Sequence, residues 1–285
     1  MASRPRCFVA HEPVEIELRC AWRVKLIDDA VVAEELERLI AIEAARTQVR
    51  VLAFTIEVNH LHAVVAQDFS GHDPTRRKGI APCQRNFASR ATRFINCQLS
   101  LRGRAWQGPY RSHPRGDSAQ LLKSITYAVM NPVKHGAVKR AEDYEFNGWE
   151  VYFEARPNGI ITHVPAMWTA LGGTPEERAK EIKELMDEVW ADGVNSGDLL
   201  AAAHRAIERR PVLRDGRRWA ETVPVGAWVG NDEAEKERKK VLARARPFVE
   251  FQPSRAPAVG SVIELRVKRA APRPLASASW REWHT

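Results

Sequence analysis

The sequence has few cysteines and no long hydrophobic run, and each shortage excludes a class of protein. Four cysteines occur in 285 residues, none in a C-x-x-C pair, which argues against a disulfide scaffold and a zinc knuckle. No segment approaches the roughly 20 apolar residues that span a bilayer, and residues 1–13 lack the apolar core of a secretion signal. We therefore expect a cytoplasmic protein from a reducing compartment, with no membrane partner.

Acidic residues are nearly missing from the middle of the chain. Residues 76–140 contain 14 Lys and Arg but a single acid, Asp117. This stretch supplies the formal charge of +8, because residues 1–75 and 141–285 are slightly acidic. Such a stretch favours nucleic acid, since arginines hold phosphates and rings stack on unpaired bases; a solvated charged face is the alternative. The candidate DNA-binding residues are Arg76, Arg77, Lys78, Arg85, Arg90, Arg93, Arg102, Arg104, Trp106, Tyr110, Arg111, Arg115, Lys123 and Lys134.

Hydrophobic periodicity predicts alternating strands and helices in the first half of the chain. The first strand has an apolar face and a charged face that includes Glu15 and Glu17, so we expect it to be half-buried. The expected elements are strands at 14–26, 49–57 and 61–67, amphipathic helices at 29–46 and 83–99, and an extended piece at 105–110.

One further helix has clear start and stop signals. Asp117 can cap its N-terminus, and Gln120, three residues later, completes a capping box. Pro132 cannot continue the backbone hydrogen bonding, so the helix is predicted over 118–131. The order strand, helix, strand, strand, helix predicts an α+β domain with a ferredoxin-like antiparallel sheet and packed helices. We expect this domain to occupy residues 1–157.

The second half reads as a basic helical extension over 158–252, followed by a flexible Pro/Arg-rich tail over 253–285 with a strand predicted at 261–267. Helices are predicted at 175–192, where Gly193 stops the helix, at 197–209 and at 232–245. One arginine-rich group either extends the DNA surface or belongs to a charged appendage. It comprises Arg205, Arg209, Arg210, Arg214, Arg217 and Arg218 with Trp219.

Two short patterns carry candidate catalytic chemistry. In His60-Leu61-His62, an extended backbone turns both imidazoles to one side, where they can share a metal ion, and turns Leu61 to the other. Tyr127 and Asn131 lie four apart on a predicted helix and share a face. A phenol there could act as a nucleophile and an amide oxygen as a ligand. Each pattern alone also fits ordinary sheet histidines and an interfacial tyrosine.

Together, three segments resemble the single-tyrosine HUH transposases, particularly the REP-associated tyrosine transposases. They are NHLHAVV (59–65), WQGPYRSH (106–113) and ITYAVMNPVKHGAVKRAEDYEFNGW (125–149). The resemblance covers residues 14 to about 155 and implies the same ferredoxin-like fold.

The resemblance also implies a role for each candidate residue. His60 and His62 would be paired ligands of Mg²⁺ or Mn²⁺, Asn131 a third and weaker ligand, and Tyr127 the nucleophile. The implied activity is cleavage and rejoining of single-stranded or hairpin DNA through a 5′-phosphotyrosine, by a monomer or a homodimer. Two alternatives stay open: a protein that binds hairpins without cutting them, and a phosphoesterase that uses the same histidines with water as nucleophile.

Overall fold

The computed structural model describes residues 8–21, 30–71, 75, 77–214 and 220–243. Several sequence predictions lie outside these residues. They are the end of the first strand (22–26), Arg76, the group Arg217, Arg218 and Trp219, and the tail from 253 with its predicted strand at 261–267.

Within the described residues, four strands form one antiparallel sheet in the order β2-β3-β1-β4. One helix connects β1 to β2, a short connection joins β2 to β3, and a second helix leads from β3 to β4. This is the βαββαβ order of a ferredoxin-like fold, so the predicted α+β class is confirmed. The elements are β1 (Val14–Arg19), α1 (Ala30–Thr47), β2 (Val49–Ile56), β3 (His60–Gln67), α2 (Ile80–Gln98) and β4 (Arg111–Pro114).

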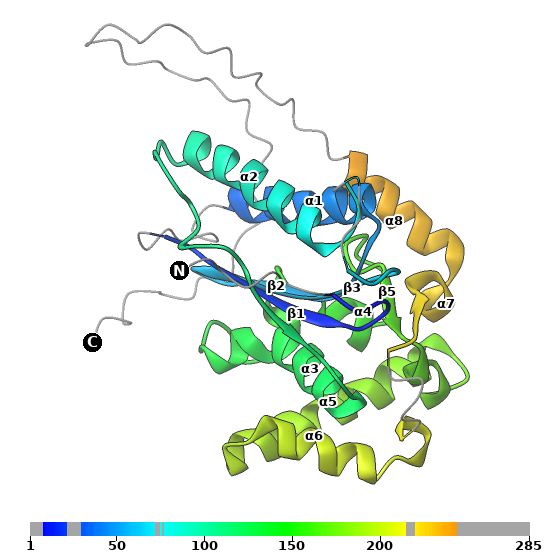
Figure 1. Ribbon diagram of the computed structural model, residues 1–285. Coiled ribbons are helices and arrows are strands. Elements are labelled where there is room, and N and C mark those ends of the chain that lie inside the picture. Colours follow the sequence, from blue (N-terminus) through cyan, green and yellow to red (C-terminus); the bar gives the residue numbers. More distant parts are fainter. Residues whose placement is uncertain (1–7, 22–29, 72–74, 76, 215–219, 244–285) are drawn as a thin grey trace, which may run out of the picture.

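Helices cover both faces of the sheet (Figure 1). α1 and α2 pack against each other on one face. α3 (Ser118–Lys134) lies on the other face, and α5 (Pro175–Ser196) and α6 (Leu199–Glu208) pack on the far side of α3. α3 is therefore enclosed between the sheet and a pair of helices from the second half of the chain.

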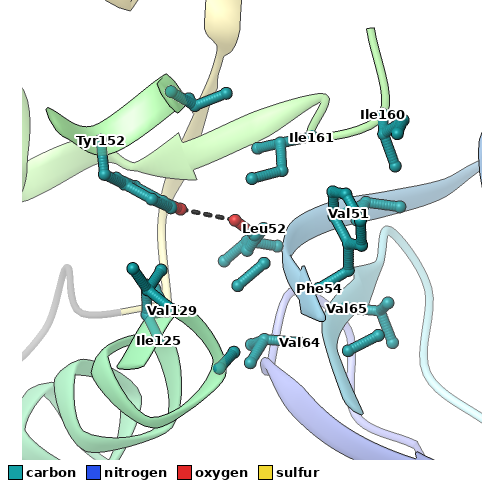
Figure 2. Packing of buried hydrophobic residues seen from close by; sticks show 14 of the residues in the cluster. Val51, Leu52, Phe54, Val64, Val65, Ile125, Val129, Tyr152, Ile160 and Ile161 are labelled. Carbon is teal, nitrogen blue, oxygen red and sulfur yellow. Dashed lines mark hydrogen bonds between the residues drawn. The ribbon is translucent and has the colours of Figure 1, made fainter. Parts of the chain in front are cut away.

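Apolar side chains between the sheet and α3 hold these two layers together (Figure 2). Leu52 and Val64 of the sheet and Ile125 and Val129 of α3 are fully buried. Tyr152 joins them, and its hydroxyl donates a hydrogen bond to the Leu52 carbonyl. Each fully buried side chain of this kind contributes about 1.5–3 kcal/mol. This packing fixes the position of α3 on the sheet.

The remaining segments pack around this core. The buried Trp228 donates its indole N–H to the Val151 carbonyl, and α8 packs against α1. The buried apolar cluster includes residues on both sides of position 157, and the predicted domain division there stays a prediction. In the described part of the chain, no helix has the length and apolar character needed to cross a membrane. The segments that pack around the core are η1 (Ala141–Asp143), α4 (Trp149–Phe153), β5 (His163–Pro165), η2 (Ala166–Leu171), η3 (Pro211–Leu213), β6 (Thr222–Pro224), α7 (Val225–Val229) and α8 (Asn231–Ala243).

The first strand differs from its prediction in length and in burial. β1 ends at Arg19, because its neighbour β3 begins at His60, the residue that pairs with Arg19. Glu15 and Glu17, expected on an exposed face, are only 7% and 8% exposed. α3 covers that face, and its Ser124 donates a hydrogen bond to Glu15. The expectation of a half-buried strand was wrong, since both of its faces are covered.

Two predicted helix ends are also wrong. α3 continues past Pro132 to Lys134, because proline lacks only its own N–H, and N–H groups after it still donate, as that of His135 does to the Asn131 carbonyl. α5 continues past Gly193 and is ended by Gly197, whose φ of 69° lies in the left-handed region. Gly193 instead lets α6 approach, since a Cβ there would lie 2.5 Å from Leu199 Cδ1.

The fourth strand lies slightly later than the extended piece predicted at 105–110. Within that piece, Trp106 forms an isolated bridge with Cys20. Gly108 and Pro109 then interrupt the pairing, because proline has no N–H to donate to a neighbouring strand. Regular pairing starts only at Arg111. The other predicted elements in the described residues occur close to their predicted limits.

Candidate active site

One end of the sheet carries a group of polar side chains on the face that α3 covers. In the register of β1 with β3, Arg19 lies opposite His60 and Glu17 lies opposite His62. Directly opposed residues of an antiparallel pair point to the same face, so these four side chains form one cluster. Leu61 points to the other face and is 2% exposed, which confirms the predicted alternation.

The four residues predicted as a catalytic set lie close together. The ring centroids of His60 and His62 are 4.9 Å apart, and those of His62 and Tyr127 are 5.4 Å apart. The amide nitrogen of Asn131 lies 3.5 Å from His60 Nε2. Because α3 packs across the sheet, the two sequence patterns meet at one place.

Both imidazoles are neutral at pH 7. Burial lowers the pKa of His60 to about 3, and it also lowers the pKa of His62 against the opposing effect of nearby carboxylates. His60 Nδ1 lies 2.9 Å from Asn59 Oδ1, and donation of its proton there leaves a lone pair on Nε2, the nitrogen nearest Asn131. A neutral ring held in this way is suited to bind a cation.

Two buried polar atoms of this set lack a hydrogen-bond partner among the described residues, namely Asn131 Oδ1 and His62 Nδ1. An unpaired buried polar group costs about 1–3 kcal/mol, so a ligand that pairs with such atoms is favoured. No group of three or more His, Cys, Asp or Glu side chains in the described ranges could hold a metal ion. The third donor would be the amide oxygen of Asn131 once the amide is turned over, because the amide nitrogen is the atom that lies 3.5 Å from His60 Nε2 in this structure. Two imidazoles and an amide oxygen fit a divalent cation.

A buried carboxylate of β1 lies behind the histidines. Burial alone would raise the pKa of Glu15, but the charge of Arg115 and other nearby groups outweigh it, so the pKa is lowered. Glu15 Oε2 accepts hydrogen bonds from Arg115 at 2.6 Å and from Ser124 at 2.7 Å, and its Oε1 lies 3.8 Å from His62 Nδ1. Glu15 therefore connects the β1 strand, α3 and the second histidine.

Tyr127 lies near two lysines. Lys134 Nζ is 3.5 Å from the Tyr127 hydroxyl oxygen and 4.8 Å from the ring centroid. Lys123 Nζ is 5.6 Å from the same centroid, and burial lowers its pKa. An anion that approaches the phenol therefore meets two ammonium groups.

These side chains open into a cleft of about 1140 Å³. The polar part of its lining comes from β1, β3 and α3 and from the segments next to them, whereas the corner of α5 and α6 contributes Trp190, Val194 and Leu199. A smaller groove of about 230 Å³, bordered by Arg111, shares Arg19 and other lining residues with the cleft. The two hollows therefore lie next to each other.

The basic stretch does not form one surface around this cleft. Arg85 and Arg93 are exposed on α2, which lies across the sheet from α3 (Figure 1). On the same helix, Arg90 pairs with Glu43. Trp106 is 5% exposed and donates its indole N–H to a carbonyl of α2. Its interpretation as a ring for base stacking is wrong, because it is a core residue.

The other candidate DNA contacts differ in their surroundings. Lys123 and Lys134 line the cleft, and Arg111 borders the smaller groove. Arg115 is held by Glu15 and has little exposure. Away from these, Arg77, Lys78, Arg102 and Arg104 are exposed and Tyr110 is partly buried.

Sequence reasoning missed several residues of the cleft. Glu15 and Glu17 were assigned to a solvent-facing side of the first strand, and the α5–α6 corner had no recognisable signal. His135 had one, because it lies four residues after Asn131 and so follows it on the same helical face. Its ring centroid is 5.9 Å from that of His60.

No family model and no curated protein matches the chain. Among solved structures, the chain is similar to a REP-associated tyrosine transposase bound to a REP hairpin. The sequences are 17% identical, the match covers 52% of this chain and 82% of the other, and the TM-score is 0.42. A likeness of this size carries no argument about function, which depends on the chemistry of the cleft.

Proposed function

We propose that this protein is a divalent-metal-dependent endonuclease and strand transferase, a transposase, that acts on single-stranded DNA bearing a hairpin. The observation that supports this proposal is that a tyrosine and two neutral imidazoles line one open cleft, and that a buried amide with an unpaired oxygen, that of Asn131, lies beside the first imidazole. Lysines beside the tyrosine suit a phosphate substrate. A protein that only binds DNA has no need of this arrangement.

His60, His62 and Asn131 would hold the Mg²⁺ or Mn²⁺ ion, which when bound supplies Lewis-acid stabilisation of charge on the scissile phosphate. The chain's own contribution is to keep both imidazoles neutral by burial, so that each ring has a lone pair to offer. Asn59 fixes the orientation of the first ring through its hydrogen bond.

Tyr127 would supply the nucleophile. Its oxygen forms a bond to phosphorus while the bond between phosphorus and the 3′ oxygen breaks, so one strand leaves with a free 3′-OH and the other stays attached as a 5′-phosphotyrosine. The phenolic proton goes to solvent and the leaving oxygen takes one up. Lys134, 3.5 Å from the hydroxyl, would stabilise the negative charge that the phenol acquires. Attack by a new 3′-OH reverses the step without ATP.

The test is adduct formation on labelled hairpin oligonucleotides of varied sequence in the presence of Mn²⁺. The wild-type chain should give a denaturation-resistant protein–DNA adduct, and Tyr127→Phe should abolish it because the nucleophilic oxygen is gone. Tyr144→Phe is the matched control, since the Tyr144 hydroxyl donates to the Ile56 carbonyl in the core and Tyr144 lies outside the residues that line the cleft, and it should retain the adduct. An adduct that persists in Tyr127→Phe would remove Tyr127 from the mechanism.

The same experiment separates the two alternative functions. Cleavage with turnover by Tyr127→Phe would favour a phosphoesterase in which water attacks the phosphate. Hairpin binding that weakens with salt, with no cleavage by the wild-type chain under any metal condition, would favour a non-cleaving binding protein.

A further inference from the structure

The lining of the cleft has a charged part and an apolar part. Near Tyr127 it presents Lys123 and Lys134, whereas the corner of α5 and α6 presents Trp190, Val194 and Leu199. Val194 is 61% exposed, which makes it unusual among the large apolar side chains of the described residues. A nucleotide has the same two-part chemistry, because it joins a charged phosphate to an apolar base face.

The apolar corner is held in a fixed position. Gly193 on α5 touches α6 so closely that a Cβ would lie 2.5 Å from Leu199 Cδ1 and 2.8 Å from Leu199 Cα. Asp198 caps α6 by accepting hydrogen bonds from its first N–H groups, and Arg205 pairs with Asp192 at 2.8 Å. The side chains on this corner therefore form a prebuilt surface rather than one that must order on binding.

We propose that the apolar corner formed by Trp190, Val194 and Leu199 binds an unpaired base of the DNA strand that Tyr127 cuts, with the base stacked on Trp190. The inference rests on the proposed function, because it takes the phosphate of that strand to lie at the lysines. An indole and two aliphatic side chains offer a sequence-tolerant surface for a base face. A base inside a duplex is paired and stacked and cannot reach this surface, so the corner selects single-stranded DNA.

The experiment measures the affinity of the full chain for a hairpin oligonucleotide with an unpaired thymidine tail on each side. Single abasic sites are placed in turn along the tails. In the wild-type chain, one position should weaken binding about 5- to 100-fold, the range for loss of one stacked base. In Trp190→Ala the intact probe should bind weaker by a similar factor, and the abasic site at that position should have no further effect.

Two further variants guard against damage to the fold. Trp190→Phe keeps a ring and should retain most of the affinity. Val194→Asn changes an exposed residue without changing charge, and it should weaken binding about threefold or more through lost apolar contact. Val212→Asn is its matched control, because Val212 is 45% exposed and lies outside the cleft lining. The control should bind like the wild-type chain.

The outcomes distinguish this inference from the proposed function. If the Tyr127 adduct forms but no tail position is coupled to Trp190, the inference is wrong and the nuclease proposal stands. If one position is coupled to Trp190 but no oligonucleotide gives an adduct, the inference that the corner binds a base is supported and the catalytic proposal fails. If the wild-type chain does not bind the probe at all, both are wrong.

Discussion

At the scale of single residues, burial removes charge from the two histidines, whereas a neighbouring arginine keeps charge on the carboxylate beside them. His60 and His62 stay neutral because burial disfavours their charged forms. Glu15 lies in the same buried region but keeps its charge, because a guanidinium nitrogen of Arg115 lies 2.6 Å from its Oε2 atom and lowers its pKa. The result is a pair of neutral rings beside an anion, an arrangement that favours a cation at this place.

The unpaired oxygen of Asn131 gives the first prediction. Asn131→Ala removes one of three proposed donors, so we expect Mn²⁺ to bind about tenfold weaker or worse. Loss of an oxygen that has no partner, and of a 3.5 Å contact from the amide nitrogen to His60 Nε2, should cost the fold little. Titration calorimetry measures the affinity, and Asn195→Ala, an exposed change on α5, is the control. Unchanged Mn²⁺ affinity with impaired cleavage would mean that the amide contacts DNA and not the ion.

A histidine outside the cleft gives a prediction for stability. Burial lowers the pKa of His163 to about 4, aided by Arg50 and opposed by Asp68, whereas an unfolded histidine titrates near 6.5. Between these values the unfolded chain binds a proton that the folded chain does not. The free energy of unfolding should therefore fall as the pH drops from about 6.5 to about 4, by at most about 3 kcal/mol, and the contribution should level off below.

Urea denaturation at pH 7 and pH 5 measures this dependence. His163→Gln should lose less stability between the two pH values than the wild-type chain, because it removes the titrating group. The exposed His204 on α6 provides the control variant, His204→Gln. An equal loss in the wild-type chain and in His163→Gln would show that other groups cause the acid sensitivity.

Prediction from sequence succeeded for residues related by local periodicity. Tyr127 and Asn131 share a face because they are four apart on a helix, and His60 and His62 share one because they are two apart on a strand. The burial of Glu15 could not be predicted in that way. It depends on which element covers the strand, a tertiary fact that alternation within the strand does not contain.

At the scale of elements, local signals located the helices but not their ends. Pro132 and Gly193 were both expected to end a helix, and the chain continues as helix through each. Gly193 is kept by packing, because α6 occupies the space that a side chain would need. A glycine therefore marks either a helix end or a close approach, and only the neighbouring element distinguishes the two.

The close contact between Gly193 and Leu199 predicts that Gly193→Ala lowers the stability of the chain, whereas the same change in a helix usually raises it. Replacing glycine by alanine inside a helix normally stabilises it by about 0.5–1 kcal/mol. Gly193→Ala should instead destabilise the chain by about 1–3 kcal/mol, because Leu199 must move. Urea denaturation tests the sign. Gly116→Ala, which meets nothing within 4 Å, should change stability little, and a stabilised Gly193→Ala would disprove the close approach.

At the scale of the whole molecule, the order of elements was predictable and the distribution of charge was not. The strand and helix order leads to a ferredoxin-like sheet because short connections and right-handed crossovers leave few alternatives. From the sequence, the net charge of residues 76–140 is expected beside the candidate catalytic residues. Folding instead places α2 on one side of the sheet and α3 on the other (Figure 1). The basic residues of this one stretch therefore lie on two separate surfaces.

The two surfaces should respond differently to the length of DNA. Lys134 lines the cleft, so Lys134→Ala should weaken binding of a short single strand and of a hairpin-bearing strand alike. Arg85 and Arg93 lie across the sheet, so Arg85→Ala combined with Arg93→Ala should spare the short strand and weaken only DNA long enough to reach α2. Each lost phosphate contact lowers the slope of log affinity against log salt by about one. Equal weakening of the short strand by the α2 variant would show that one continuous surface binds the DNA.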